Sequence, residues 1–268
     1  MLTKSRKPFI HRCFKILLLL LFFTPAYTQI PYDPIYTPEV TASVLSQPLI
    51  EHIAFLLPLS KVFLFLIVIA VMINPSRYSR LFFGYYIFLL IIVGIFQNMA
   101  VTQDYGFSWL IGNSLVIFIV AGFCLFDFSK RNTIFSRKNF EMKRLWVLIP
   151  MLLAFLMPYS MNAQGVIEPG LGWTVFMNEA GVTYCMITPV MVGVMILFLK
   201  DTYQPTLFIV SFIGFVFGLM NMLTWFVFQA ESWWMGVLHL PLMILSSYAL
   251  YLNRLFKAEK ITPANGKR

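Results

Sequence analysis

The sequence predicts an all-α integral membrane protein built as a seven-transmembrane helix bundle, and three observations support this prediction. The chain has 268 residues, of which 59% are hydrophobic and only 12% are charged. Soluble domains are about half apolar and a quarter charged, and one soluble core of this size could not bury so much apolar surface. In addition, seven apolar stretches approach the length that a spanning helix needs, and the basic residues occupy alternate loops.

The first segment, residues 1–28, has the order of residues found in a secretory signal peptide. A basic leader precedes an apolar run at 16–23, and Thr24 and Pro25 follow that run. This run is too short to cross about 30 Å of hydrocarbon. An uncleaved anchor over about residues 9–28 is the alternative. Residues 29–51 are polar and rich in proline, so we expect an external extended arm.

The transmembrane domain is predicted at residues 52–253, and a basic cytoplasmic tail follows at 254–268. The seven spans are expected at about 52–74, 81–98, 108–127, 145–161, 182–199, 206–228 and 235–253. In lipid, only a helix satisfies every backbone polar group within a single segment. Strands of a barrel would be about half as long and would alternate in polarity, and these stretches do not.

The loops predict the orientation of the chain. Outside the leader and the spans, all fourteen Lys and Arg residues lie in alternate loops and the tail, and the opposite loops have none. They are Arg77, Arg80, Lys130, Arg131, Arg137, Lys138, Lys143, Arg144, Lys200, Arg254, Lys257, Lys260, Lys267 and Arg268. Positive residues stay on the cytoplasmic side. We therefore expect a multi-pass protein of the cell membrane with its N-terminus outside and its C-terminus in the cytoplasm.

The net charge of +9 follows from this loop pattern. A basic soluble protein would suggest nucleic acid as a partner, but the distribution of charge here does not. The lipid bilayer is the expected partner, together with a small-molecule or lipid ligand or another membrane protein.

Two ionisable residues lie inside predicted spans. Lys61 lies about nine residues into the first span, roughly 12–14 Å below its outer end. A lysine near the centre of a span costs roughly 2.5–3.5 kcal/mol, and it normally faces the bundle and has a partner. The alternative is a side chain that reaches outward to the interface. His239 lies at a similar depth in the last span, before Pro241, where it is either a proton-exchanging group or a hydrogen-bonded packing residue.

Other polar residues share this outer half: Asn113, Glu179, Asn221 and Trp225. Asn221 and Trp225 are four residues apart, so they lie on one face of a helix. The hypothesis is an outward-facing ligand site formed by Lys61 and His239 with these four residues, because pockets between helices combine apolar walls with a few convergent polar groups. The alternative is that these side chains only hold the helices together, with about 0.6 kcal/mol per contact.

Several motifs are absent from the sequence. It contains no HExxH, GxSxG or glycine-rich phosphate loop, and its three cysteines are too scattered for a zinc site. We therefore expect no metal and no cofactor. Rhodopsins and G-protein-coupled receptors share the helix count, but this last span has neither a retinal lysine nor an NPxxY motif. The helix count alone is a likeness of fold and says nothing about function.

Three functions remain open. The first is a small-ligand-binding receptor or carrier with its site in the extracytoplasmic half of the bundle. The second is an intramembrane enzyme acting on a lipid or isoprenoid, with His239 and Glu179 as acid and base. No nucleophile or metal set accompanies that pair, so the sequence favours a protein that is not an enzyme. The third is an accessory or scaffold subunit of a membrane complex.

Overall fold

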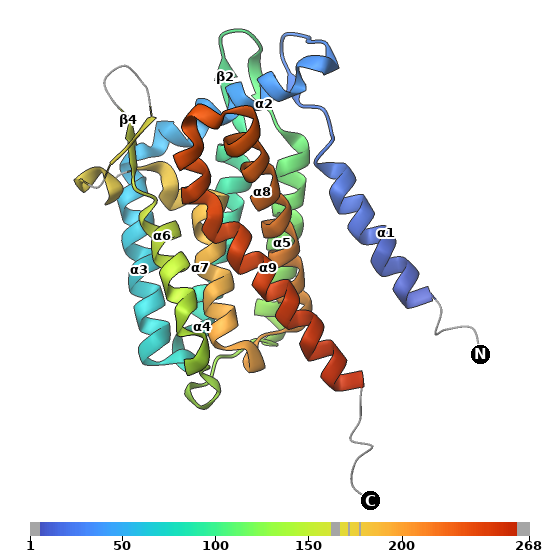
Figure 1. The fold of residues 1–268 in the computed structure, drawn as a ribbon, viewed down its shortest axis with the longest axis vertical. Helices are drawn as coiled ribbons and strands as arrows, with labels where there is room; N and C mark the ends of the chain where they lie inside the picture. The colour runs from blue at the N-terminus through green and yellow to red at the C-terminus, as the bar shows by residue number, and fades with distance from the viewer. Residues whose placement is uncertain (1–5, 162–166, 171, 177, 262–268) are drawn as a thin grey trace, which may run out of the picture. The chain divides into compact units, whose positions relative to one another are not determined.

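The computed structural model describes residues 6–161, 167–170, 172–176 and 178–261, and it is 79% helical (Figure 1). Within these described residues, four helical segments are long and apolar enough to cross a membrane. They are Pro75–Gln97, Ile111–Lys130, Gln204–Phe228 and Ala230–Phe256. The predicted class of all-α membrane protein is therefore confirmed, and several helices long enough to span make the chain a multi-pass protein.

A helix overlaps each predicted apolar stretch, but the helices differ in length. They are α3 (Leu57–Ile73), α4 (Pro75–Ile92), α5 (Ile111–Lys130), α6 (Leu148–Leu156), α7 (Tyr184–Leu197), α8 (Gln204–Leu223) and α9 (Trp233–Ile261). Short π-helical segments extend α4 over Val93–Gln97 and α8 over Thr224–Phe228. The helices α3 and α7 have 17 and 14 residues, and α6 has nine. These three fall short of the usual spanning length.

The short α6 has a local cause. A 3-10 segment, Met142–Val147, precedes it, and Met157 ends it in the left-handed conformation with φ of 43°. Pro158 follows, and a proline cannot continue the hydrogen-bond ladder of a helix. The chain then turns into a two-stranded hairpin, in which β4 (Tyr159–Met161) pairs antiparallel with β5 (Ile167–Pro169).

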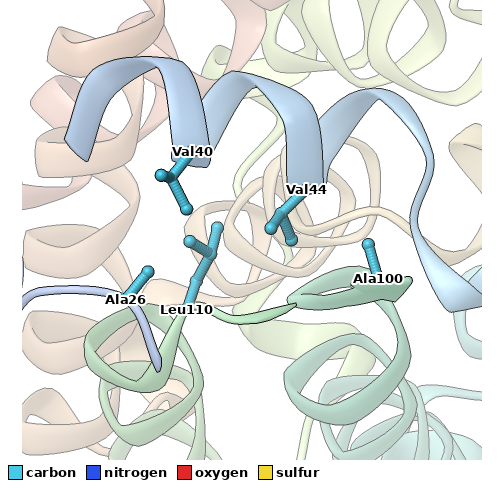
Figure 2. Close-up of a cluster of buried hydrophobic side chains, with 5 residues drawn as sticks. All are labelled: Ala26, Val40, Val44, Ala100 and Leu110. Carbon is cyan, nitrogen blue, oxygen red and sulfur yellow. The ribbon is translucent and has the colours of Figure 1, made fainter. Parts of the chain in front are cut away.

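The chain divides into two compact units, of which the first comprises Met1–Ile53 and Leu90–Ala121. It contains α1 (Arg6–Leu21) and an antiparallel sheet of β1 (Tyr27–Thr28), β2 (Met99–Thr102) and β3 (Gly106–Trp109), with β3 in the centre. A small apolar core packs α2 (Thr37–Ser46) against β2, the residue before β1 and the residue after β3. Figure 2 shows its members, Ala26, Val40, Val44, Ala100 and Leu110.

Residues 29–51 are not extended throughout, in contrast to the prediction. They include a 3-10 turn, Pro34–Tyr36, then α2, and then the beginning of a 3-10 segment, Leu49–Leu56. Prolines begin these helices, since both the turn and α2 have a proline in their first two positions. A proline there removes only an N–H that a helix start leaves unpaired anyway.

The second unit comprises Ala54–Leu89 and Gly122–Arg268, so it holds α3 and all of α6 to α9. Within it α8 and α9 lie side by side (Figure 1). Two glycines allow this close approach. A Cβ on Gly218 would lie 3.0 Å from Cα of Met243, and one on Gly214 would meet Oγ of Ser246. Small residues spaced four apart are typical of tightly packed membrane helices.

Candidate functional site

Lys61 lies in the second turn of α3 and is only 1% exposed. Its ammonium donates hydrogen bonds to the carbonyl oxygen of Val175 at 2.6 Å, to Oδ1 of Asn178 at 2.7 Å and to the carbonyl oxygen of Leu156 at 3.2 Å. An ammonium has three donors, so the protein itself satisfies the whole group. The predicted alternative, in which Lys61 reaches outward to the interface, does not agree with this burial.

The end of α6 explains why an ammonium is stable here. Leu156 is the last residue of α6, where the final carbonyls lack partners within the helix. The partial negative charge at a helix C-terminus also favours a cation. The ring of Phe155 adds a weaker contact, with its centroid 5.8 Å from Nζ of Lys61. Glu179, another residue of the predicted site, has a side chain outside the described residues.

Asn178 was missed by the sequence analysis, although it is the residue that joins Lys61 to the hairpin. Its Nδ2 donates to the carbonyl oxygens of Met157 at 2.9 Å and Tyr159 at 3.3 Å. One amide thus accepts from the lysine and donates to both residues that flank Pro158. No sequence pattern marks this residue, because it lies in an irregular loop without periodicity.

A second polar group lies between α7, α8 and α9. The rings of Trp225 and His239 are stacked, with centroids 6.1 Å apart and planes 27° apart. Asn221, one turn before Trp225, donates to the carbonyl oxygen of Phe217 at 2.8 Å and lies 3.5 Å from Sγ of Cys185. Two of the predicted site residues, Trp225 and His239, therefore do come together, and Asn221 lies four residues before Trp225 in the chain.

The hydrogen bonds of this group are incomplete. Nδ1 of His239 lies 2.8 Å from the carbonyl oxygen of Met235, which can only accept, so Nδ1 carries a proton and a neutral ring has its lone pair on Nε2. Within the described residues, Nε2 makes no hydrogen bond, and neither does the buried Nε1 of Trp225. Trp225 belongs to the π-helical segment Thr224–Phe228, and such segments are frequent at functional sites.

The predicted residues do not form one cluster. Among the described residues, no hydrogen bond, ion pair or ring contact connects Lys61 with Trp225 or His239. Asn113 is half-buried near the start of α5 and belongs to the first unit, whereas the other four described candidates belong to the second. The predicted single site is therefore not formed by these residues: Trp225 and His239 are in contact, whereas Lys61 has other partners and Asn113 belongs to the other unit.

A groove of about 360 Å³ lies between the hairpin and the start of α9. Its walls are mostly apolar and are formed by Pro158, Pro169, Gly170, Trp233, Trp234, Val237 and Leu238. Pro158 is the residue that Asn178 fixes on both sides, and Leu238 immediately precedes His239. Two residues that line the groove are therefore sequence neighbours of residues in the two polar groups.

Within the described residues, no group of three His, Cys, Asp or Glu side chains is placed to hold a metal ion. Comparison with protein-family models, with curated proteins and with solved structures found no match.

Proposed function

We propose that this chain is a small-ligand-binding membrane protein, a receptor or carrier, whose site includes Trp225 and His239. One observation carries the proposal. A buried indole N–H without an acceptor is stacked on an imidazole whose Nε2 is also without a partner. A buried donor left unpaired costs about 1–3 kcal/mol, and an unexplained one in a native structure points to a missing partner.

The chemistry of the pair defines the polar part of the ligand. The indole needs an acceptor, and Nε2 of a neutral imidazole needs a donor. A hydroxyl group supplies both from one oxygen atom. The groove at the start of α9, with its two tryptophans and two prolines, would take an apolar body. The proposed ligand is thus a largely apolar molecule with a hydroxyl group, and the volume of the groove is near the lower end of the range for ligand sites.

The same unpaired donor favours a protein with two states. Nε1 of Trp225 has no access to solvent in this structure, so a ligand reaches it only after the indole or a neighbouring side chain moves. The closed state carries the cost of the unpaired donor, and the liganded state relieves it. A ligand shifts a conformational equilibrium only through such a difference between states. A receptor and a carrier both depend on that difference, whereas a scaffold subunit does not.

Native mass spectrometry of protein purified gently from its own membranes tests this proposal. The wild type should retain a small molecule, and Trp225→Phe should retain markedly less because only the N–H donor and part of the ring are removed. Trp146→Phe is the matched control, since this indole packs on Tyr248 with centroids 5.0 Å apart. Equal retention by Trp225→Phe and wild type would rule out this site. Bare protein in every sample would argue for the scaffold function, and altered lipids after incubation would indicate the enzyme.

We also propose seven spans with an external N-terminus, a cytoplasmic C-terminus and a leader that acts as a signal peptide. The alternation of basic loops supports the orientation. Membrane-impermeant maleimide added to whole cells tests it in a chain without Cys13, Cys124 and Cys185. Asp104→Cys and Glu231→Cys should react, whereas Lys138→Cys and Lys200→Cys should react only after lysis. The opposite pattern would reverse the topology, and a mixed pattern would change the number of spans.

A further inference from the structure

The basic loop between α5 and α6 is a folded element of the second unit. Phe135, at its centre, is completely buried. Its ring stacks on Phe198 with centroids 4.8 Å apart, and it lies 6.4 and 6.0 Å from the rings of Phe82 and Phe83. Aromatic contacts at such distances are favourable beyond the area that they bury. The loop is therefore anchored against α4 and the end of α7.

Carboxylates hold the backbone of this loop. Asp127 accepts hydrogen bonds from N and Oγ1 of Thr133, at 2.9 and 2.8 Å. Asp201 accepts from N of Ser136 at 2.6 Å and from Nδ2 of Asn139 at 2.5 Å. These acids act on the backbone and on neutral side chains. Within the described residues, Asp127 therefore binds Thr133 and forms no ion pair with a cation of the loop.

Most cations of the loop are consequently left unneutralised. Glu141 pairs with Lys200 at 3.4 Å and lies 3.9 Å from Arg144. Between Lys130 and Arg144, the exposed cations without a carboxylate within 4.0 Å, counting described residues only, are Lys130, Arg131, Arg137, Lys138 and Lys143. We call these five residues the basic face. All of them belong to the second unit, and they lie between Lys130 and Lys143 in the chain.

We propose that the basic face binds the phosphate headgroups of anionic lipids in the leaflet on its own side of the membrane. Lys130 is the last residue of α5, a helix long and apolar enough to span, so the face begins where that helix leaves the hydrocarbon. Clusters of basic residues at this position attract anionic lipid. A loop that is already folded loses little further conformational entropy on binding. The proposal does not depend on the ligand site or on which side of the membrane is cytoplasmic.

Two variants test the proposal. Both change the same three residues, but only one of them changes the charge. The first, Arg137→Gln/Lys138→Gln/Lys143→Gln, removes three charges. The second, Arg137→Lys/Lys138→Arg/Lys143→Arg, keeps them. Titration of each detergent-purified protein with phosphatidylglycerol, followed by native mass spectrometry, measures the affinity. We expect the neutral variant to bind about ten-fold more weakly or worse, and the charge-conserving variant to bind like the wild type.

The controls separate this result from misfolding and from other anions. Phosphatidylcholine should bind all three proteins equally, and all three should unfold at similar temperatures, because the altered side chains are exposed. Inorganic phosphate should compete only weakly, since it lacks the acyl chains that hold a lipid at the interface. Equal binding of phosphatidylglycerol by the neutral variant would overturn the proposal. An acidic protein that co-purifies with the wild type and displaces the lipid would overturn it in favour of a protein partner.

Discussion

Lys61 and Asn178 are 117 residues apart in the sequence, and the ammonium of the first donates to the amide oxygen of the second over 2.7 Å. The amide nitrogen of Asn178 then donates to the carbonyl oxygens of Met157 and Tyr159. A buried cation is thereby held by neutral oxygens and connected to the wall of the groove at Pro158. This relationship makes Lys61 a positioning residue for the hairpin.

Asn178→Ala should destabilise the protein strongly. The substitution leaves a buried ammonium short of one acceptor and two carbonyls short of a donor, and removing a hydrogen bond to a charged group costs about 1.5–3 kcal/mol. A drop of about 5 °C or more in the unfolding temperature in detergent is expected. Asn132→Ala is the control, because that side chain is exposed and makes no hydrogen bond within the described residues. Similar unfolding temperatures for the two variants would show that Lys61 is satisfied in another way.

Gly181→Ala tests how tightly the same region is packed. A Cβ on Gly181 would meet Oγ of Ser60 and would lie 3.0 Å from both the Leu57 carbonyl oxygen and Cγ of Lys61. Overpacking of this kind costs about 1–3 kcal/mol. Gly122→Ala makes the same chemical change in α5 with nothing within 4 Å of the new atom. This control should gain up to about 1 kcal/mol from helix propensity. The two variants should therefore move the unfolding temperature in opposite directions, and a loss in both would contradict this account.

The positions of the helices were predictable because apolar periodicity and composition act locally. Each of the predicted stretches overlaps a helix, and Asn221 and Trp225 lie in consecutive helical segments of one stretch, α8 and Thr224–Phe228. The lengths were not predictable from hydropathy, since Met157 and Pro158 end α6 early and a 3-10 segment replaces the start of the first span. Hydropathy measures the preference for lipid, whereas the ends of helices depend on backbone conformation.

The partners of the polar residues could not be predicted for a different reason. Depth along the membrane suggested that Lys61 and His239 meet, yet they contact different groups, Asn178 in one case and Trp225 in the other. Depth fixes one coordinate of a side chain and leaves its angle around the bundle undefined. Backbone carbonyls, which satisfy two of the three donors of Lys61, are also invisible in a sequence.

Asp127→Ala should loosen the basic loop and leave the bundle intact. The carboxylate accepts from both the backbone N and the hydroxyl of Thr133, and the same hydroxyl accepts from N of Tyr203 at 2.9 Å. Loss of these bonds should raise the population of open loop conformations. Limited trypsin digestion should then cut more rapidly after Arg131, Arg137 and Lys138. The control is Asp104→Ala, an exposed aspartate of the first unit. Unchanged cleavage in Asp127→Ala would show that Phe135 alone holds the loop.

Trp225→Phe and Trp109→Phe compare an unpaired indole with a paired one. Nε1 of Trp109 donates to Oγ of Ser114 at 2.8 Å, whereas Nε1 of Trp225 has no acceptor within the described chain. Both substitutions remove the same atoms, so the loss of packing is similar and the hydrogen bond makes the difference. In protein stripped of ligand, Trp109→Phe should cost about 1 kcal/mol more than Trp225→Phe, which thermal unfolding in detergent can detect. Adding the retained ligand should reverse this order, because the wild-type indole then gains a partner that phenylalanine cannot replace. If the two substitutions lowered the stability equally, both with the ligand bound and after its removal, the Trp225 donor would already be satisfied. The proposed site would then lose its main support.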